Sequence, residues 1–210
     1  MISKPAEDPD RIYTSYVERH FAEHQQVVAN SVQLLRAQIV SSADVMINAL
    51  AHEKKIVVFG NGGSSTQASH LAGELVGRFS KAPRRPLPAM ALGADSGVVT
   101  CIANDFGYES LFERQVEALA QPGDVAIGFT TSGKSENVRR GLAMAARKRA
   151  ISIALTGAAG LEGGIAEHVL KVPSNATAYI QEVHLMILHM WCVCIDAAFR
   201  NESQEESKSD

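Results

Sequence analysis

Glycine is missing from the first 59 residues of this chain, and all 16 glycines lie at or after Gly60. The sequence of 210 residues has little net charge, a formal −3, which excludes the strong positive field of a dedicated nucleic-acid binder. We find no run of about 20 apolar residues of the kind that spans a membrane. The polar, acidic N-terminus does not resemble a secretory signal. We therefore expect a cytoplasmic globular protein that binds neither nucleic acid nor membrane.

Cysteine is scarce as well, with Cys101, Cys192 and Cys194 as the complete set. An odd number, with two of them beside Trp191 in an apolar stretch, predicts reduced and buried thiols. The Cys-x-Cys pair is also a conceivable metal site, but cysteine is commonly a small core hydrophobe and we favour that interpretation.

The glycine-free N-terminal part also has no proline between Pro9 and Pro83, so it can form long uninterrupted helix. Apolar residues recur there at threes and fours, which is helical periodicity. We predict one or two long helices, with a possible break near Asn30 or Ser41–Ser42. The expected organisation is a helical arm for oligomerisation (1–54), a body (55–199) and a polar tail (200–210).

After residue 54, short β-rich runs alternate with helical segments. The expected strands are Lys55–Gly60, Pro88–Leu92, Asp124–Phe129, Ala150–Thr156 and His168–Pro173. The expected helices are Ser64–Phe79, Ser110–Ala120, Ser135–Arg149 and Ala178–Phe199. This alternation, with continuous apolar strands, predicts an α/β fold whose parallel sheet is covered by helices on both faces. Such sheets bind ligands at the carboxyl ends of their strands.

Two loops are expected at that edge. The first, Asn61-Gly62-Gly63-Ser64, is a glycine-rich turn in which Ser64 would cap the next helix; its alternative is a tight turn without a ligand. The second, within 128–135, matches a nucleotide P-loop letter for letter. Gly128 is expected inside a strand, however, and no aspartate follows to hold Mg²⁺. Its hydroxyls and helix N-terminus favour a monophosphate site over a triphosphate site or a structural turn.

Two helices carry candidate metal ligands or acid–base groups. His70 and Glu74 are four residues apart and share a helix face. Gln181 and His189 lie on the same side of a second, apolar helix but well apart along it. Gln181 and His189 could both bind one metal ion, or one of its ligands could come from another subunit. Ordinary surface or core residues remain the alternative.

The ordered motifs together resemble one family. They are Asn61-Gly62-Gly63-Ser64, His70-Leu71-Ala72-Gly73-Glu74-Leu75, Gly77-Arg78-Phe79, Asn104-Asp105-Phe106-Gly107, Thr131-Ser132-Gly133-Lys134-Ser135, Leu155-Thr156-Gly157 and Ile180-Gln181-Glu182-Val183-His184. The chain resembles the sedoheptulose 7-phosphate isomerases (phosphoheptose isomerases) of the sugar isomerase (SIS) domain class over about 15–199. The resemblance implies a five-stranded parallel sheet between helices. It also implies a homotetramer with the long N-terminal helix in the assembly and active sites near subunit boundaries.

The resemblance also implies site residues. The phosphate pocket would consist of Ser64, Thr130, Thr131, Ser132 and Ser135. The sugar contacts would be Asn61, Gly62, Gly63, Asn104 and Asp105, with Gln181 also at the substrate. One zinc ion per subunit would be held by His70, Glu74, Gln181 and His189. Glu74 and His189 would be the catalytic pair.

The implied reaction converts sedoheptulose 7-phosphate to D-glycero-D-manno-heptose 7-phosphate through an enediol, the first step of nucleotide-activated heptose biosynthesis. Four residues depart from the usual family pattern: Gln67 for Asp, Thr130 for Ser, Lys134 for Asn and Tyr179 for Arg. The main alternative is a non-catalytic SIS-domain sugar-phosphate sensor or scaffold of the replication-initiator-binding type, which lacks the catalytic Glu and late His. A P-loop nucleotide-binding enzyme is the second alternative.

Overall fold

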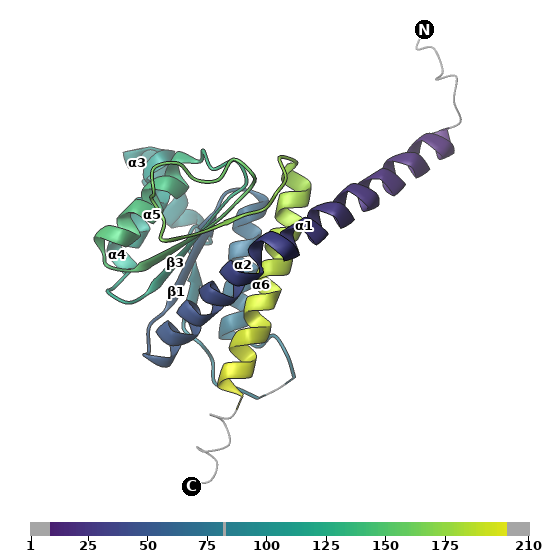
Figure 1. Ribbon diagram of the computed structural model, residues 1–210. Helices are drawn as coiled ribbons and strands as arrows, with labels where there is room; N and C mark the ends of the chain where they lie inside the picture. The colour runs from purple at the N-terminus through teal and green to yellow at the C-terminus, as the bar shows by residue number, and fades with distance from the viewer. Residues whose placement is uncertain (1–8, 82, 201–210) are drawn as a thin grey trace.

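The computed structural model describes residues 9–81 and 83–200. Figure 1 shows an α/β body from which one long helix extends. In chain order the elements are α1 (Pro9–Ala51), β1 (Ile56–Gly60), α2 (Gly63–Val76), β2 (Ala89–Ala91), α3 (Ser96–Phe106), the short 3-10 helix η1 (Tyr108–Ser110), α4 (Leu111–Leu119), β3 (Val125–Thr130), α5 (Glu136–Arg147), β4 (Ile151–Thr156), β5 (His168–Lys171) and α6 (Thr177–Phe199). The predicted fold class and all five predicted strands are confirmed.

Helix α3 is the element that sequence reasoning missed. Its first residues, Ser96-Gly97-Val98-Val99-Thr100, are poor helix formers. The helix begins because the Asp95 carboxylate accepts hydrogen bonds from the backbone N–H groups of Gly97 and Val98. An N-cap of this kind satisfies donors that the first helical turn leaves free.

The sheet has the strand order β2-β1-β3-β4-β5, and every pairing is parallel. Strand β2, the next strand in the chain, lies on one side of β1, and β3 lies on its other side. The strand order therefore reverses between β1 and β3, where an open parallel sheet forms a crevice at its carboxyl edge. The loops after Gly60 and Thr130 meet at this point.

Two hydrophobic cores lie on opposite faces of the sheet. Along β1, Ile56 and Val58 belong to the core under α1, α2 and α6, whereas Val57 and Phe59 belong to the core under α3, α4 and α5. Successive side chains of a strand point to opposite faces, so a strand buried on both sides is apolar throughout. This double burial explains why the predicted strands were continuous apolar runs.

The N-terminal helix α1 is a single helix of 43 residues. It does not break at Asn30 or at Ser41–Ser42. The Ser42 hydroxyl donates to the Gln38 carbonyl at 2.7 Å, and its oxygen accepts from Trp191 Nε1 of α6 at 2.9 Å. The hydroxyl that suggested a break therefore anchors α6 against α1. The expected tail lies outside the described residues except for Arg200, and the role of the arm in oligomerisation stays a prediction.

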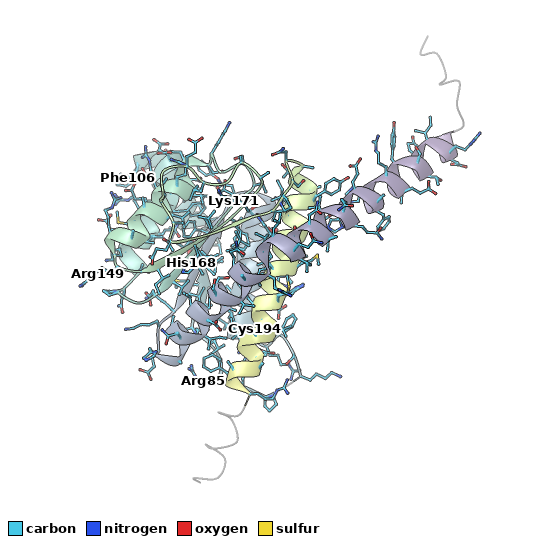
Figure 2. All side chains as sticks on the ribbon, in the orientation of Figure 1. Arg85, Phe106, Arg149, His168, Lys171 and Cys194 are labelled. Carbon is cyan, nitrogen blue, oxygen red and sulfur yellow. The ribbon has the colours of Figure 1, made fainter. Side chains whose placement is uncertain are left out.

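Contrary to expectation, helix α6 is long and apolar enough to cross a membrane by length and composition alone. Half of its most apolar window is buried inside the protein, against α1 and α2. All three cysteines are free: Cys192 is buried, Cys194 is half-buried on α6 (Figure 2), and Cys101 is exposed, contrary to the prediction of buried thiols. Burial raises the pKa of the Cys192 thiol to about 12, which keeps it protonated.

Candidate functional site

The turn between β1 and α2 is tightly packed. A Cβ atom added at Gly60 would lie 2.8 Å from Ser64 Cβ, so only glycine fits there. The N-cap of α2 is Gly62, with φ of 57°, and Ser64 lies buried in the first helical turn. The expectation that Ser64 caps the helix is therefore wrong, because α2 already begins at Gly63 and Ser64 is its second residue.

Asn61 is held by two residues that sequence reasoning missed. Its side chain and that of Asn137 exchange two amide hydrogen bonds, of 2.8 and 2.9 Å, across the carboxyl ends of β1 and β3. The Tyr108 hydroxyl also donates to Asn61 Oδ1 at 2.9 Å. Tyr108 comes from η1, whose approach to β1 depends on the unpredicted α3. No local motif marks it.

The hydroxyl-rich loop follows β3. Thr130 is buried and donates to the Ser135 hydroxyl at 3.2 Å, while Ser132 Oγ accepts from the Lys134 backbone N–H at 3.2 Å. Gly128 lies inside β3, as predicted. The first glycine of the P-loop pattern therefore belongs to a strand and does not open a glycine-rich loop. Beside this loop lies a cavity of about 290 Å³, lined by Ser132, Gly133, Lys134, Arg139, Gly160 and Glu162, among others.

The predicted catalytic pair lies between α2 and α6. His70 Nε2 is 3.1 Å from Glu74 Oε1 on its own helix and 3.1 Å from His189 Nε2 on α6. The Glu74 side chain is 24% exposed and that of His70 is 40% exposed, so a small ligand can reach both. The Phe79 ring also packs against the His189 imidazole, with the two ring centroids 5.5 Å apart.

Gln181 lies at the β1–α2 turn. A Cβ atom at Gly63 would be 2.9 Å from its side-chain amide, and the Gln181 carbonyl accepts from Gln67 Nε2 at 2.6 Å. As placed, the His, Cys, Asp and Glu side chains within 9–81 and 83–200 form no metal centre. His70 Nε2 nevertheless lies 3.1 Å from both a second imidazole nitrogen and a carboxylate oxygen. Imidazole and carboxylate groups are zinc ligands, so the chemistry of these residues fits that ion.

Two predicted sugar contacts do not join this group. Asn104 and Asp105 are exposed near the end of α3, where the Asn104 amide donates to Asp105 Oδ1 at 2.7 Å. Asp105 Oδ2 also lies 3.8 Å from Cys101 Sγ. Their assignment as sugar contacts stays a prediction.

His184 has a structural environment. The ring is fully buried, and its Nε2 lies 3.2 Å from the Thr156 carbonyl. Burial lowers its pKa to about 4, against the weaker effect of this hydrogen bond, so the ring is neutral at pH 7 and donates to the carbonyl. It therefore links α6 to the end of β4.

Tyr179, which replaces an arginine of the family pattern, contacts α1. Its hydroxyl donates to Glu23 Oε2 at 2.8 Å, and its ring stacks on His24 with centroids 6.0 Å apart. The neighbouring Glu182 lies 3.3 Å from the Nε2 atoms of both His20 and His24. The substitution thus serves the packing of α6 on α1.

Comparison with known proteins places this geometry in context. A model of the SIS domain matches residues 19–157. The phosphoheptose isomerase of Aquifex aeolicus is 49% identical over 86% of this chain and 94% of its own length. Two solved phosphoheptose isomerases superimpose well. That of Neisseria gonorrhoeae has a TM-score of 0.80 at 37% identity, covering 88% of this chain and 99% of that chain. That of Francisella tularensis has a TM-score of 0.83 at 33% identity, covering 88% and 98%.

Proposed function

The chain belongs to the phosphoheptose isomerases of the SIS-domain family, and we propose that it interconverts sedoheptulose 7-phosphate and D-glycero-D-manno-heptose 7-phosphate. It is an aldose–ketose isomerase. The observation that carries the proposal is the meeting of Glu74 and His189 at His70, between α2 and α6. A carboxylate and an imidazole in one accessible site are the acid–base groups that proton transfer between neighbouring carbons requires.

The phosphate would be held by the hydroxyl-rich loop. Thr131, Ser132 and Ser135 precede the N-terminus of α5, where free backbone N–H groups attract an anion. The exposed ammonium group of Lys134 adds a positive charge at the loop. Binding energy from the remote phosphate can thus orient carbons 1 and 2 at the catalytic pair.

Glu74 would act as the general base. It removes a proton from carbon 1 of the ketose while His189 donates a proton to the oxygen on carbon 2, which yields the enediol. His189 then takes the proton of the hydroxyl on carbon 1, and Glu74 returns its proton to carbon 2. Both residues end in their starting states, and the substrate has exchanged a ketone for an aldehyde.

One zinc ion per subunit is part of the proposal. His70, Glu74, Gln181 and His189 would hold it, and the supporting observation is the contact of the two imidazoles and the carboxylate. When bound, zinc supplies Lewis-acid polarisation of the substrate carbonyl.

We also propose a cytoplasmic homotetramer. Helices α1 and α6 form an apolar groove of about 280 Å³, with Val32, Met186, Met190 and Val193 among its lining residues. The arm of α1 exposes Tyr13, Tyr16 and Phe21. Exposed apolar surface of this extent on adjacent helices is typical of an interface. Among the residues that line this groove, Arg36 alone is charged. An apolar groove of this kind suits an apolar helix face, and we expect copies of the same chain to supply it.

An assay with sedoheptulose 7-phosphate, with and without a chelator, tests these statements. We expect the heptose phosphate to form and chelation to abolish its formation, with recovery on added Zn²⁺. Turnover that is indifferent to chelation would overturn the zinc proposal alone. Binding of the sugar phosphate without any turnover would overturn the isomerase proposal and favour a sensor.

A further inference from the structure

The buried ion pair between Arg84 and Asp196 lies next to the proposed catalytic pair without belonging to it. We propose that Arg84 and Asp196 are positioning residues that set the distance between Glu74 on α2 and His189 on α6. This inference rests on the proposed isomerase function. It concerns two residues that no motif of the sequence singled out.

Arg84 binds the end of α2. One of its terminal nitrogens donates to the Glu74 carbonyl at 2.6 Å, and the other donates to the Leu75 carbonyl at 2.9 Å. The last carbonyls of a helix have no partner within it, so this guanidinium completes α2 at the very residue whose carboxylate is the proposed base. A positive group at a helix C-terminus is also favoured by the helix dipole.

Asp196 binds the same guanidinium from α6. Its Oδ1 accepts from Arg84 Nε at 2.7 Å, and its Oδ2 accepts from the Ser80 backbone N–H at 3.0 Å. The two side chains are only 1% and 5% exposed. Hydrogen bonds from Ser80 and Arg84 hold the pKa of Asp196 below its usual value, although burial acts in the opposite direction. The pair is therefore charged and shielded from solvent.

Spacing along α6 connects this pair to the catalytic imidazole. Asp196 follows His189 by seven residues, about two helical turns, so the two side chains share a face of α6. Phe79, which contacts the His189 ring, precedes Ser80 directly. The next residue after Arg84 also contacts α6: the Arg85 guanidinium, labelled in Figure 2 near the end of that helix, lies 5.2 Å from the centre of the Phe199 ring.

The consequence is a rigid connection between two reacting groups. Glu74 and His189 come from separate helices, and a displacement of about 1 Å between reacting groups can slow catalysis about 100-fold. Arg84 bonds to the backbone of Glu74 itself, and Asp196 bonds to Arg84. Loss of this connection should lower kcat while leaving the distant phosphate loop, and therefore KM, nearly unchanged.

The test compares Asp196→Asn with a double variant, Arg84→Met with Asp196→Leu, in the full-length protein. The first leaves a buried guanidinium without its counter-charge. The second removes both charges, so it can regain stability, but it cannot donate to the α2 carbonyls. We expect kcat to fall about 10- to 100-fold in both variants, with KM within about two-fold of wild type.

The matched control is a second ion pair, between the half-buried Lys55 and the buried Asp124. Asp124 accepts from the Lys55 ammonium at 2.5 Å and from the Lys55 backbone N–H at 3.0 Å, just before β1 and β3 begin. Asp124→Asn should lower the unfolding temperature but leave kcat unchanged. If kcat recovers together with the unfolding temperature in the double variant, or if Asp124→Asn lowers kcat equally, the positioning role is refuted. A wild-type protein without isomerase activity would instead refute the proposed function.

Discussion

His70 Nε2 and His189 Nε2 lie 3.1 Å apart, although 119 residues separate them in the chain. Each nitrogen belongs to a different helix, and Glu74 reaches the His70 side of the contact. The three groups therefore share one small volume at which a proton or a cation can be exchanged. The assignments of acid, base and ligand all depend on this contact, and it is the first target for mutation.

Replacing Glu74 by Gln should abolish turnover. The amide keeps the shape of the side chain but cannot accept a proton, and general-base catalysis is worth about 10²- to 10⁴-fold. His189→Ala should have a loss of similar size. The measurement is the initial rate of heptose phosphate formation, with inhibition by inorganic phosphate as the control for an intact anion site. Near-normal rates in either variant would remove that residue from the catalytic pair.

Lys134→Asn restores the residue common in the family and tests the added charge. Lys134 is exposed, so solvent partly screens its attraction to a phosphate. We therefore expect KM to rise only about two- to five-fold when the lysine is replaced. The effect should shrink as salt is added. Lys148→Asn, at the other end of α5, is the matched control and should leave KM unchanged. Equal KM values for all three proteins would show that Lys134 does not face the phosphate.

Tyr108→Phe removes the hydroxyl that bonds to Asn61 Oδ1. Asn61 would keep its two bonds to Asn137 but lose the one that comes from η1. Loss of a single hydrogen bond of this kind should lower kcat/KM about two- to ten-fold. The exposed position of Tyr108 predicts no change in the unfolding temperature. A kcat/KM equal to that of the wild type would show that Tyr108 has no part in orienting Asn61.

The neutral, buried His184 should make stability depend on pH. Its pKa is about 4 in the folded protein, below the 6.5 of a histidine in an unfolded chain, so the unfolded chain binds the extra proton first as pH falls. The contribution is fully present above pH 6.5 and is lost as pH falls from there toward 4, with a slope of about 1.4 kcal/mol per pH unit.

The measurement is urea unfolding at several pH values. His184→Gln can still donate to the Thr156 carbonyl but does not titrate, so its free energy of unfolding should vary less between pH 6.5 and 4 than that of the wild type. Parallel curves for the two proteins would contradict the assignment.

Local patterns in the sequence were sufficient for most of the fold. Apolar runs predicted every strand, because strands such as Ile56–Gly60 are buried on both faces and must be apolar throughout. The missing helix shows the limit of this reasoning. A run with Gly97 and two valines forms a helix only because Asp95 caps it and the body supplies a surface to pack on. With α3 unpredicted, the contact of Tyr108 with Asn61 could not be foreseen.

By itself, the sequence determined the order of elements and the chemistry of the site residues. A glycine-free start specifies helix, and glycine turns after strands specify loops at the carboxyl edge, because both depend on neighbouring residues alone. Tertiary structure decided which side chains meet. His70 with His189, Arg84 with Asp196 and Asn61 with Asn137 are contacts across helices and strands. Their distances follow from how the two cores pack on the sheet, and no local pattern of residues specifies that packing.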